Sequence, residues 1–460
     1  MSVENSFKIL MFPWLAHGHV FPYLELAKRI LKGKNFQIYI CSTPINFTSI
    51  NTFINKNLLE NSIQLVDIQL QPSEELPPHY HTPKNLPPNL LFTLINAFQS
   101  THSNFSNIIA TLKPDLVIYD IFQPWAAKIS SLQGIPAVHF ASIGAGVLSF
   151  IHHHYTPSDI ISTPFPFPVL QCKDHEVKSI EKLLEFLYEN LHDVDQDFLF
   201  GSFKHSCNIV LVKTSRSFEQ KYMNYIQEKC KKRIVSVGPL VSNSNNITNE
   251  EDSESIIQWL NSKSLRSTVY ISFGSEYFLN DKEVEEIAKG LELCDANFIW
   301  VIRFPAGDKT ISLENTLPRG FLNRVKDRGL VVEGWAPQVP ILAHSSIACF
   351  ASHCGWSSLM ESLYYGVPVI AMPMQFDQPI NARLAGEGGF SLEVDRDENG
   401  MLSGENIAKG INTVFEEKTG EELRFRAKEV SEKMRRDEEE DLDEVIDQLL
   451  LLCKNYKLQE

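Results

Sequence analysis

The chain has 460 residues, of which 43% are hydrophobic and 22% are charged, and it carries a formal net charge of −15. This length predicts two domains, and the composition is that of an ordinary globular protein. The negative charge argues against a nucleic-acid or anionic-membrane surface, because both favour basic patches.

Short apolar runs alternate with helix-like stretches through both halves of the chain. The predicted strands of the first half are residues 7–12, 36–41, 116–120, 137–141 and 209–214. Those of the second half are residues 268–273, 297–302, 329–334, 347–351 and 367–372. Apolar strands separated by helices are typical of βαβ units and parallel sheets. We therefore expect an α/β protein with domains at 1–240 and 256–440, joined by the polar, acidic linker 241–255.

The loop after the first strand has the sequence PWLAHGH and contains His17 and His19. Ligands of open α/β sheets bind at the carboxyl ends of the strands, where this loop lies. The loop lacks the G-x-G-x-x-G pattern, which disfavours a nicotinamide or flavin oxidoreductase. A histidine here could act as a base near neutral pH, although a lone loop histidine is more often an exposed surface residue. Asp120 ends the third predicted strand, where the common alternative is a cap on the following turn.

Other features predict no metal, disulfide or membrane chemistry. The eight cysteines show no C-x-x-C spacing, so we expect neither a disulfide framework nor a zinc site. Asp193 and Asp195 form a D-x-D pattern, but without the sequence context of a metal site. The consecutive histidines 152–154 cannot all point one way on a regular element, so they do not predict a zinc site. No signal peptide and no run of 18 apolar residues is evident, so we expect a cytoplasmic protein without a membrane span.

The last part of the chain predicts an amphipathic helix, at about residues 441–460. Val445, Leu449 and Leu450 supply its apolar positions. The acidic stretch 437–444, DEEEDLDE, is expected to form a solvated helix face rather than a tail that binds a partner.

Residues 335–378 form a continuous block of motifs. It opens on Trp-Ala-Pro-Gln, carries His-Cys-Gly-Trp-Ser-Ser in its centre and closes on Phe-Asp-Gln. A buried strand is followed by a tight turn and a helix that ends at Gly366, and the N-terminus of such a helix can bind a pyrophosphate. Ser358 and Glu361 have the spacing of a capping box, so spacing alone favours helix capping by Glu361.

This block resembles the signature box of the plant secondary-product glycosyltransferases, the family 1 UDP-glycosyltransferases. The resemblance implies the GT-B fold, in which two doubly wound Rossmann-like domains face a cleft and the last helix returns to the first domain. It also implies inverting, metal-independent sugar transfer by a monomer, with UDP-glucose as the co-substrate and no cofactor.

The resemblance assigns roles to individual residues. His19 corresponds to the catalytic base that precedes the first helix, and Asp120 to the carboxylate that orients it. Trp335 would stack on uracil (a core position is the alternative for this indole), and Glu361 would hold the ribose hydroxyls rather than cap its helix. The other implied donor-binding residues are Ser275, Ala336, Gln338, His353, Trp356, Ser357, Ser358, Asp377 and Gln378. A terminal Gln in this box is the usual form for glucose donors.

Ser357 stands where the family usually carries Asn, and the Ser-Ser form resembles the branch that adds a sugar to a sugar already on a plant metabolite. We therefore expect a hydrophobic glycoside acceptor, such as a terpenoid, flavonoid or lignan glucoside. The loops 72–90 and 163–170 are its expected walls, and the expected acceptor-binding residues are Trp14, Phe122, Ser142 and His152. The alternatives are glucosylation of an aglycone and a non-catalytic UDP-sugar-binding protein.

Overall fold

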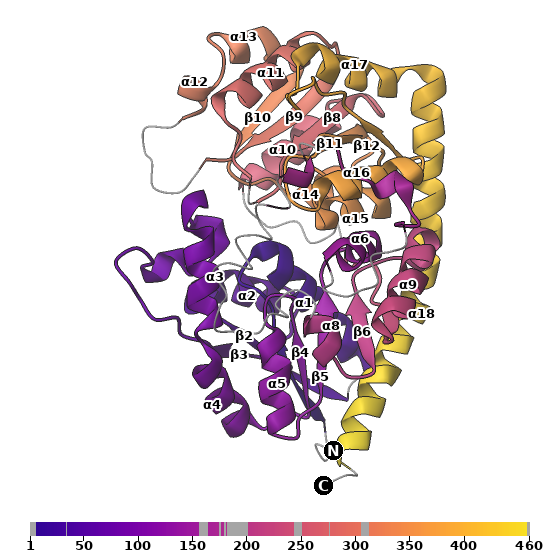
Figure 1. Cartoon of the computed structure of the whole chain (residues 1–460). Helices are drawn as coiled ribbons and strands as arrows, with labels where there is room; N and C mark the ends of the chain where they lie inside the picture. The colour runs from indigo at the N-terminus through magenta and orange to yellow at the C-terminus, as the bar shows by residue number, and fades with distance from the viewer. Residues whose placement is uncertain are drawn as a thin grey trace. The chain divides into compact units, whose positions relative to one another are not determined.

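The computed structural model describes residues 6–33, 35–155, 164–173, 176–178, 181, 201–242, 251–275, 277–304 and 312–457 (Figure 1). These residues form two compact units. The first comprises the described residues of 1–165, 182–240 and 436–460, and the second those of 166–181 and 241–435. The segment 166–181 thus belongs to the second unit, although it lies within the range expected for the first domain. Of the expected linker, residues 243–250 lie outside the described residues and residues 251–255 begin a helix.

The described part of the first unit contains a seven-stranded parallel sheet in the order β3-β2-β1-β4-β5-β6-β7. Its strands are β1 (Phe7–Phe12), β2 (Phe36–Ser42), β3 (Ile63–Asp67), β4 (Leu116–Tyr119), β5 (Ala137–Ala141), β6 (Ile209–Val212) and β7 (Arg233–Ser236). Its helices are α1 (His17–Ile30), α2 (Pro44–Lys56), α3 (Leu91–Gln99), α4 (His102–Leu112), α5 (Pro124–Leu132), α6 (Ala145–Tyr155), α8 (Gly201–His205) and α9 (Arg216–Cys230). Its 3-10 turns are η1 (Leu31–Gly33), η2 (Pro78–Tyr80), η3 (Pro83–Asn85) and η4 (Pro88–Leu90).

The described part of the second unit contains a six-stranded parallel sheet in the order β10-β9-β8-β11-β12-β13. Its strands are β8 (Thr268–Ser272), β9 (Asn297–Ile302), β10 (Gly329–Glu333), β11 (Ile347–Ser352), β12 (Val369–Ala371) and β13 (Ser391–Glu393). Its helices are η5 (Pro168–Leu170), α10 (Glu251–Asn261), α11 (Asp281–Glu292), α12 (Leu313–Thr316), α13 (Phe321–Val325), α14 (Gln338–Leu342), α15 (Trp356–Tyr364), α16 (Gln378–Glu387) and α17 (Gly404–Phe415). The last helix, α18 (Glu417–Lys457), contributes residues to both units.

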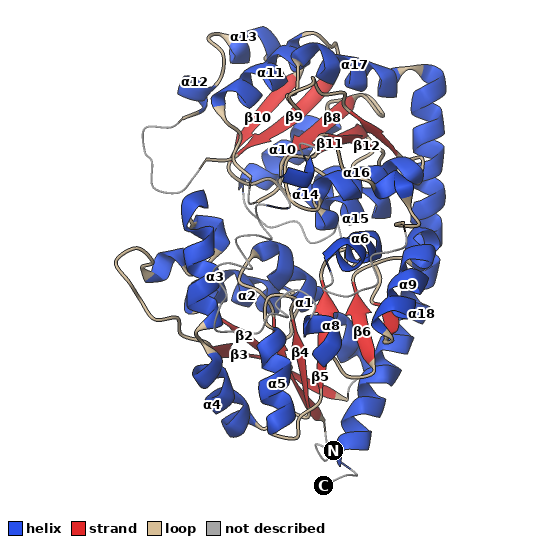
Figure 2. Cartoon of the chain, in the orientation of Figure 1, coloured by secondary structure: helices blue, strands red, loops and turns tan. Residues whose placement is uncertain are grey.

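Both sheets have the expected parallel architecture with helices alongside (Figure 2). The central strands β4, β5, β6, β8 and β11 are buried along their whole length, as parallel strands covered on both faces should be. All ten predicted strands are present. The structure adds β3, β7 and β13, each of which lies at the edge of its sheet. Edge strands can be short and partly polar, so their hydrophobic signal is weak.

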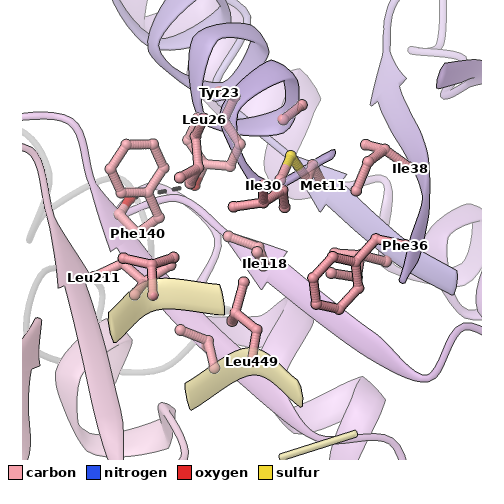
Figure 3. Close-up of a cluster of buried hydrophobic side chains, with 14 of the residues drawn as sticks. Met11, Tyr23, Leu26, Ile30, Phe36, Ile38, Ile118, Phe140, Leu211 and Leu449 are labelled. Atoms are coloured by element: carbon pink, nitrogen blue, oxygen red, sulfur yellow. Dashed lines mark hydrogen bonds between the residues drawn. The ribbon is translucent and has the colours of Figure 1, made fainter. Parts of the chain in front are cut away.

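The core of the first unit includes the C-terminal end of α18, as expected for the last helix. Figure 3 shows Leu449 of α18 near Ile118 and Leu211 of the sheet, in the cluster that also contains Phe140. Val445 and Leu449 are fully buried in this cluster, and Leu450 packs against it partly buried. Burying such side chains stabilises the fold by roughly 1.5–3 kcal/mol each.

The prediction that residues 437–444 form a solvated helix face is wrong for one side of α18. Glu438 pairs with Arg29, and Asp441 accepts from Arg216 Nε at 2.7 Å and from Ser236 Oγ at 2.7 Å. Acidic side chains at 437, 438, 441 and 444 share one helix face and meet basic or hydroxyl groups of the first unit, whereas those at 439, 440 and 443 are exposed. Sequence could not distinguish the two faces, because the basic partners lie more than 200 residues away.

No described helix is long and apolar enough to cross a membrane.

Candidate functional site

The first candidate site lies where β1 and β4 end. These strands are neighbours in register, with Phe12 opposite Tyr119, so the loop after β1 lies beside Asp120. His19 Nδ1 is 2.9 Å from Asp120 Oδ2 and 3.0 Å from Oδ1. The helix begins earlier than expected, with Ala16 as its N-cap, so His19 lies in the first turn of α1 rather than before it.

Backbone donors hold the Asp120 carboxylate in place. Its side chain is 1% exposed and accepts the Ile121 N–H at 2.7 Å and the Trp14 N–H at 3.3 Å. A fixed carboxylate at Nδ1 favours the tautomer that carries its proton there, which makes Nε2 the basic nitrogen of a neutral His19. The His19 side chain is only 18% exposed, which does not fit the alternative of a surface residue.

Of the expected acceptor-binding residues of this unit, Ser142 and Phe122 lie beside His19. Ser142 Oγ is 3.1 Å from His19 Nδ1, and the Phe122 ring lies 5.7 Å from the His19 ring, centroid to centroid. The Trp14 indole is 3% exposed and packs against the Phe122 ring, so little of its surface is open to a ligand. His152 is on α6, where burial lowers the pKa of its imidazole.

The loop 72–90 is fastened next to the residues that precede α1. The Thr82 hydroxyl donates to the Leu15 carbonyl at 3.2 Å, and the Thr43 hydroxyl donates to the His81 carbonyl at 2.8 Å. Both hydrogen bonds are buried and join segments far apart in the sequence. They place this loop within the same unit as His19, beside the turn that leads to it.

The second candidate site is the turn between β11 and α15. Cys354 has a φ of 64°, a left-handed conformation that is unusual for a non-glycine residue. Two contacts hold it: Ser352 Oγ accepts the Cys354 N–H at 3.1 Å, and Asn381 Nδ2 donates to the Cys354 carbonyl at 3.0 Å. Gly355 is the N-cap of α15 and has no side chain to cap the helix. The N–H groups of the first turn thus face the position where an anion can bind.

The capping-box alternative for Ser358 and Glu361 is wrong. Both residues lie inside α15, where neither can cap its N-terminus. Gln338, the first residue of α14, reaches them instead: its Nε2 donates to Glu361 Oε2 at 2.7 Å and to Ser358 Oγ at 3.2 Å. The S-x-x-E spacing was a misleading signal because the helix begins two residues before Ser358.

His353 is buried in the same turn, between two glycines. A Cβ atom added to Gly274 or to Gly355 would come within 2.5 Å of His353 Nε2, so neither position has room for a side chain. Burial lowers the pKa of His353 to about 4. The ring is therefore neutral at pH 7, and it can offer a pyrophosphate a hydrogen bond but no positive charge.

The residues expected at the nucleobase and at the sugar also lie in this unit. Trp335 is 59% exposed, which excludes the alternative of a core indole. Gln378 Oε1 accepts the N–H groups of Met374 and Gln375, both at 2.9 Å, and so closes the loop that precedes α16. The other expected residues are the buried Ala336 and Trp356 and the partly exposed Ser275, Ser357 and Asp377.

Asn381 belongs to this arrangement but was missed from the sequence. Its side chain is fully buried, and its Nδ2 donates both to the Cys354 carbonyl and, at 2.8 Å, to Asp377 Oδ2. It therefore joins the turn before α15 to the loop before α16. The available signal was its position four residues after Asp377, which places two residues on one helix face.

Metal-binding groups do not converge within the described ranges. No group of three or more His, Cys, Asp or Glu side chains there could hold an ion. The histidines 152–154 are included in that search, and His153 Nδ1 lies 2.6 Å from the Tyr225 hydroxyl oxygen. Asp193 and Asp195 lie outside the described residues.

Comparison with known proteins identifies the family. Residues 106–427 match the family described as UDP-glucoronosyl and UDP-glucosyl transferase. The chain belongs to this family. This UDP-glycosyltransferase has relatives that match along nearly the whole chain, so the family assignment covers both units.

Three relatives illustrate the similarity. A mogroside IIIx synthase from Siraitia grosvenorii is 44% identical and covers 97% of this chain and 98% of its own length. A beta-D-glucosyl crocetin beta-1,6-glucosyltransferase from Gardenia jasminoides is 45% identical, with 96% and 98% covered. A flavanone 7-O-glucoside 2''-O-beta-L-rhamnosyltransferase from Citrus maxima is 42% identical, with 98% of each covered.

Solved structures confirm the predicted GT-B fold. A UGT transferase from Siraitia grosvenorii in complex with UDP superimposes with a TM-score of 0.77 at 25% identity, covering 96% of this chain and 99% of that one. A Glycyrrhiza uralensis protein complexed with glycyrrhetinic acid 3-O-monoglucuronide has a TM-score of 0.79 at 23% identity, with 99% and 97% covered. The second match supports the fold alone.

Proposed function

We propose that this UDP-glycosyltransferase transfers glucose from UDP-glucose to a sugar hydroxyl of a plant metabolite glycoside. The observation that carries the catalytic part is the contact between His19 Nδ1 and the buried Asp120 carboxylate. The glycoside acceptor is supported by the names of two relatives, which state a glucosyl crocetin and a flavanone glucoside as their substrates. Glucose is favoured because Gln378 ends the motif block.

The proposed reaction is a single displacement with His19 as the base. The acceptor oxygen attacks the anomeric carbon, and its proton passes to His19 Nε2. The bond between the anomeric carbon and the β-phosphate oxygen breaks, and UDP leaves with that bonding pair. The resulting imidazolium is stabilised by Asp120 at Nδ1, as in the hydrolase triad. Direct displacement inverts the anomeric carbon, so an α-linked donor gives a β-linked product.

The leaving pyrophosphate is assigned to the second unit. The first-turn N–H groups of α15 and the neutral His353 are suited to donate hydrogen bonds to its oxygens. Trp335 and Glu361 would hold the uracil and the ribose. We propose that these groups stabilise the leaving UDP without a divalent cation.

A paired acceptor assay tests the proposal. One terpenoid or flavonoid aglycone and its monoglucoside are each incubated with UDP-glucose, and product linkage is read by NMR. The expected product is a β-linked sugar on the existing glucose of the monoglucoside. Glucosylation of the aglycone alone would establish the alternative acceptor class. Donor binding without transfer to any acceptor, under conditions in which a related glucosyltransferase turns over, would favour a non-catalytic binding protein.

A further inference from the structure

The strongest additional signal is a chain of polar contacts that begins at Tyr270 and reaches Glu361. We propose that Tyr270 is a positioning residue for the donor site: its hydroxyl fixes the amide of Gln338, which in turn holds the Glu361 carboxylate in the orientation that binds ribose. This inference rests on the proposed function, because it takes Glu361 as the ribose-binding group.

The contacts join three elements of the second unit. Tyr270 lies on β8, and its hydroxyl donates to Gln338 Oε1 at 3.3 Å. Gln338 begins α14, and its Nε2 donates to Glu361 Oε2 on α15 at 2.7 Å and to Ser358 Oγ at 3.2 Å. The two ends of the Gln338 amide thus join β8 to α15: the oxygen is bonded to Tyr270, and the nitrogen is bonded to Ser358 and Glu361.

The Tyr270 hydroxyl and the Glu361 carboxylate together set which way the Gln338 amide faces, and the hydroxyl holds its oxygen end. The oxygen and nitrogen ends of an amide have nearly the same shape, and only hydrogen bonds distinguish them. A rotated amide would direct its oxygen at the Glu361 carboxylate, which repels it. Burial raises the pKa of Tyr270 and outweighs the lowering by the Ser272 side chain, and the Glu361 charge raises it further, so the hydroxyl keeps its proton and remains a donor.

Packing fixes the hydroxyl independently of this hydrogen bond. The Tyr270 ring is fully buried and stacks on Phe350 of β11, with ring centroids 4.8 Å apart and planes inclined by 26°. Removing only the hydroxyl in Tyr270→Phe should leave that stacking intact. The variant therefore tests the hydrogen bond and not the fold of the sheet.

The arrangement also gives the Gln338 side chain an indirect role in the donor site. Its amide oxygen and nitrogen both have protein partners, so its side chain acts through Glu361 rather than on the edge of the base. One oxygen of Glu361 is held by the amide, which restricts rotation of the carboxylate. A carboxylate fixed in this way loses less conformational freedom when it binds two adjacent hydroxyls.

The test compares the affinities for UDP and 2′-deoxy-UDP, measured by calorimetry. Wild type should prefer UDP, and Glu361→Ala should largely lose that preference. Tyr270→Phe should weaken UDP binding by about 2- to 10-fold, the range for one neutral hydrogen bond, and should reduce the preference for UDP. In the double variant Tyr270→Phe/Glu361→Ala, the preference should be that of Glu361→Ala alone, because the two residues act in series.

Tyr23→Phe is the matched control. Tyr23 is a fully buried tyrosine of the first unit whose hydroxyl donates to the Phe140 carbonyl at 3.2 Å, so its removal should leave the preference for UDP unchanged. If Glu361→Ala keeps the wild-type preference for UDP, the assignment of Glu361 as the ribose-binding residue is wrong. If Glu361→Ala loses the preference but Tyr270→Phe keeps it, or if the two effects are additive, the positioning role of Tyr270 is overturned.

Discussion

Replacing Asp120 by Asn should reverse the tautomer of His19. The Asp120 Oδ1 atom accepts the Ile121 N–H at 2.7 Å, whereas Oδ2 accepts the Trp14 N–H at the longer distance of 3.3 Å. The amide of an asparagine would place its oxygen at the stronger donor and its NH₂ group at the Oδ2 position. That position is 2.9 Å from His19 Nδ1, so the NH₂ group would donate to this nitrogen. The ring proton would then reside on Nε2, which could no longer take the acceptor proton.

The expected cost is a fall in kcat of about 10²–10⁴-fold, the range for losing a positioned base and comparable to the same substitution in a hydrolase triad. Turnover would be measured at saturating UDP-glucose and acceptor, and UDP affinity by calorimetry. UDP affinity should not change, because the nucleotide-binding groups are assigned to the second unit. Asp115→Asn is the control: Asp115 lies just before β4 and accepts the Lys8 N–H at 2.7 Å, away from His19. Near-normal kcat for Asp120→Asn, with the chemical step rate-limiting, would refute the tautomer argument.

Three further outcomes are expected. Burial lowers the pKa of His353 from 6.5 to about 4, so the unfolded chain takes up a proton at a higher pH than the folded protein does. The contribution of the neutral ring to stability is therefore fully present above pH 6.5 and is lost as the pH falls toward 4. Between pH 7 and pH 5, protonation of His353 in the unfolded chain should lower the free energy of unfolding by about 2 kcal/mol. Denaturation of His353→Asn at both pH values should show a correspondingly smaller loss, and equal losses would contradict the shift. Trp335→Ala should weaken UDP binding by roughly 1–3 kcal/mol, the scale of stacking on a base. The control is Trp259→Ala, which should leave UDP binding unchanged: Trp259 is on α10, with Lys263 Nζ 4.4 Å from its ring centroid. Equal calorimetric affinities for wild type and Trp335→Ala would argue against stacking. Activity should survive excess EDTA, and a complete loss restored by Mg²⁺ or Mn²⁺ would reopen the assignment of Asp193 and Asp195.

Sequence patterns predicted the sheets well where the strands are central. The runs at 7–12, 137–141 and 297–302 agree with the observed strands residue for residue, because buried parallel strands are mostly apolar, and each of these runs contains a single polar residue. The edge strand β13, Ser391–Glu393, escaped notice because it is three residues long and contains two polar residues. The final helix was predicted from its apolar positions, but the ion pairs of its acidic face depend on distant basic residues.

The site residues were predicted through the motif block, and their connections were not. No local pattern indicates that Asn381 binds the Cys354 carbonyl, or that Gln338 joins Tyr270 to Glu361, because each contact depends on where separate elements end in the sheet. The S-x-x-E spacing favoured Glu361 as a helix cap. Because Ser358 and Glu361 both lie inside α15, Glu361 instead accepts a hydrogen bond from Gln338. Spacing alone therefore indicates which groups are present, and tertiary structure decides what they bind.

The most direct test of the account is the turnover of His19→Ala, measured together with its affinity for UDP. The account predicts a kcat lower by about 10²–10⁴-fold at saturating UDP-glucose and acceptor, with UDP affinity unchanged. His17→Ala, two residues away on the same turn, should keep near-normal turnover; His17 Nε2 lies 3.5 Å from Ser49 Oγ. If His19→Ala retained near-wild-type kcat with the chemical step rate-limiting, His19 would not be the base and the proposed mechanism would be contradicted.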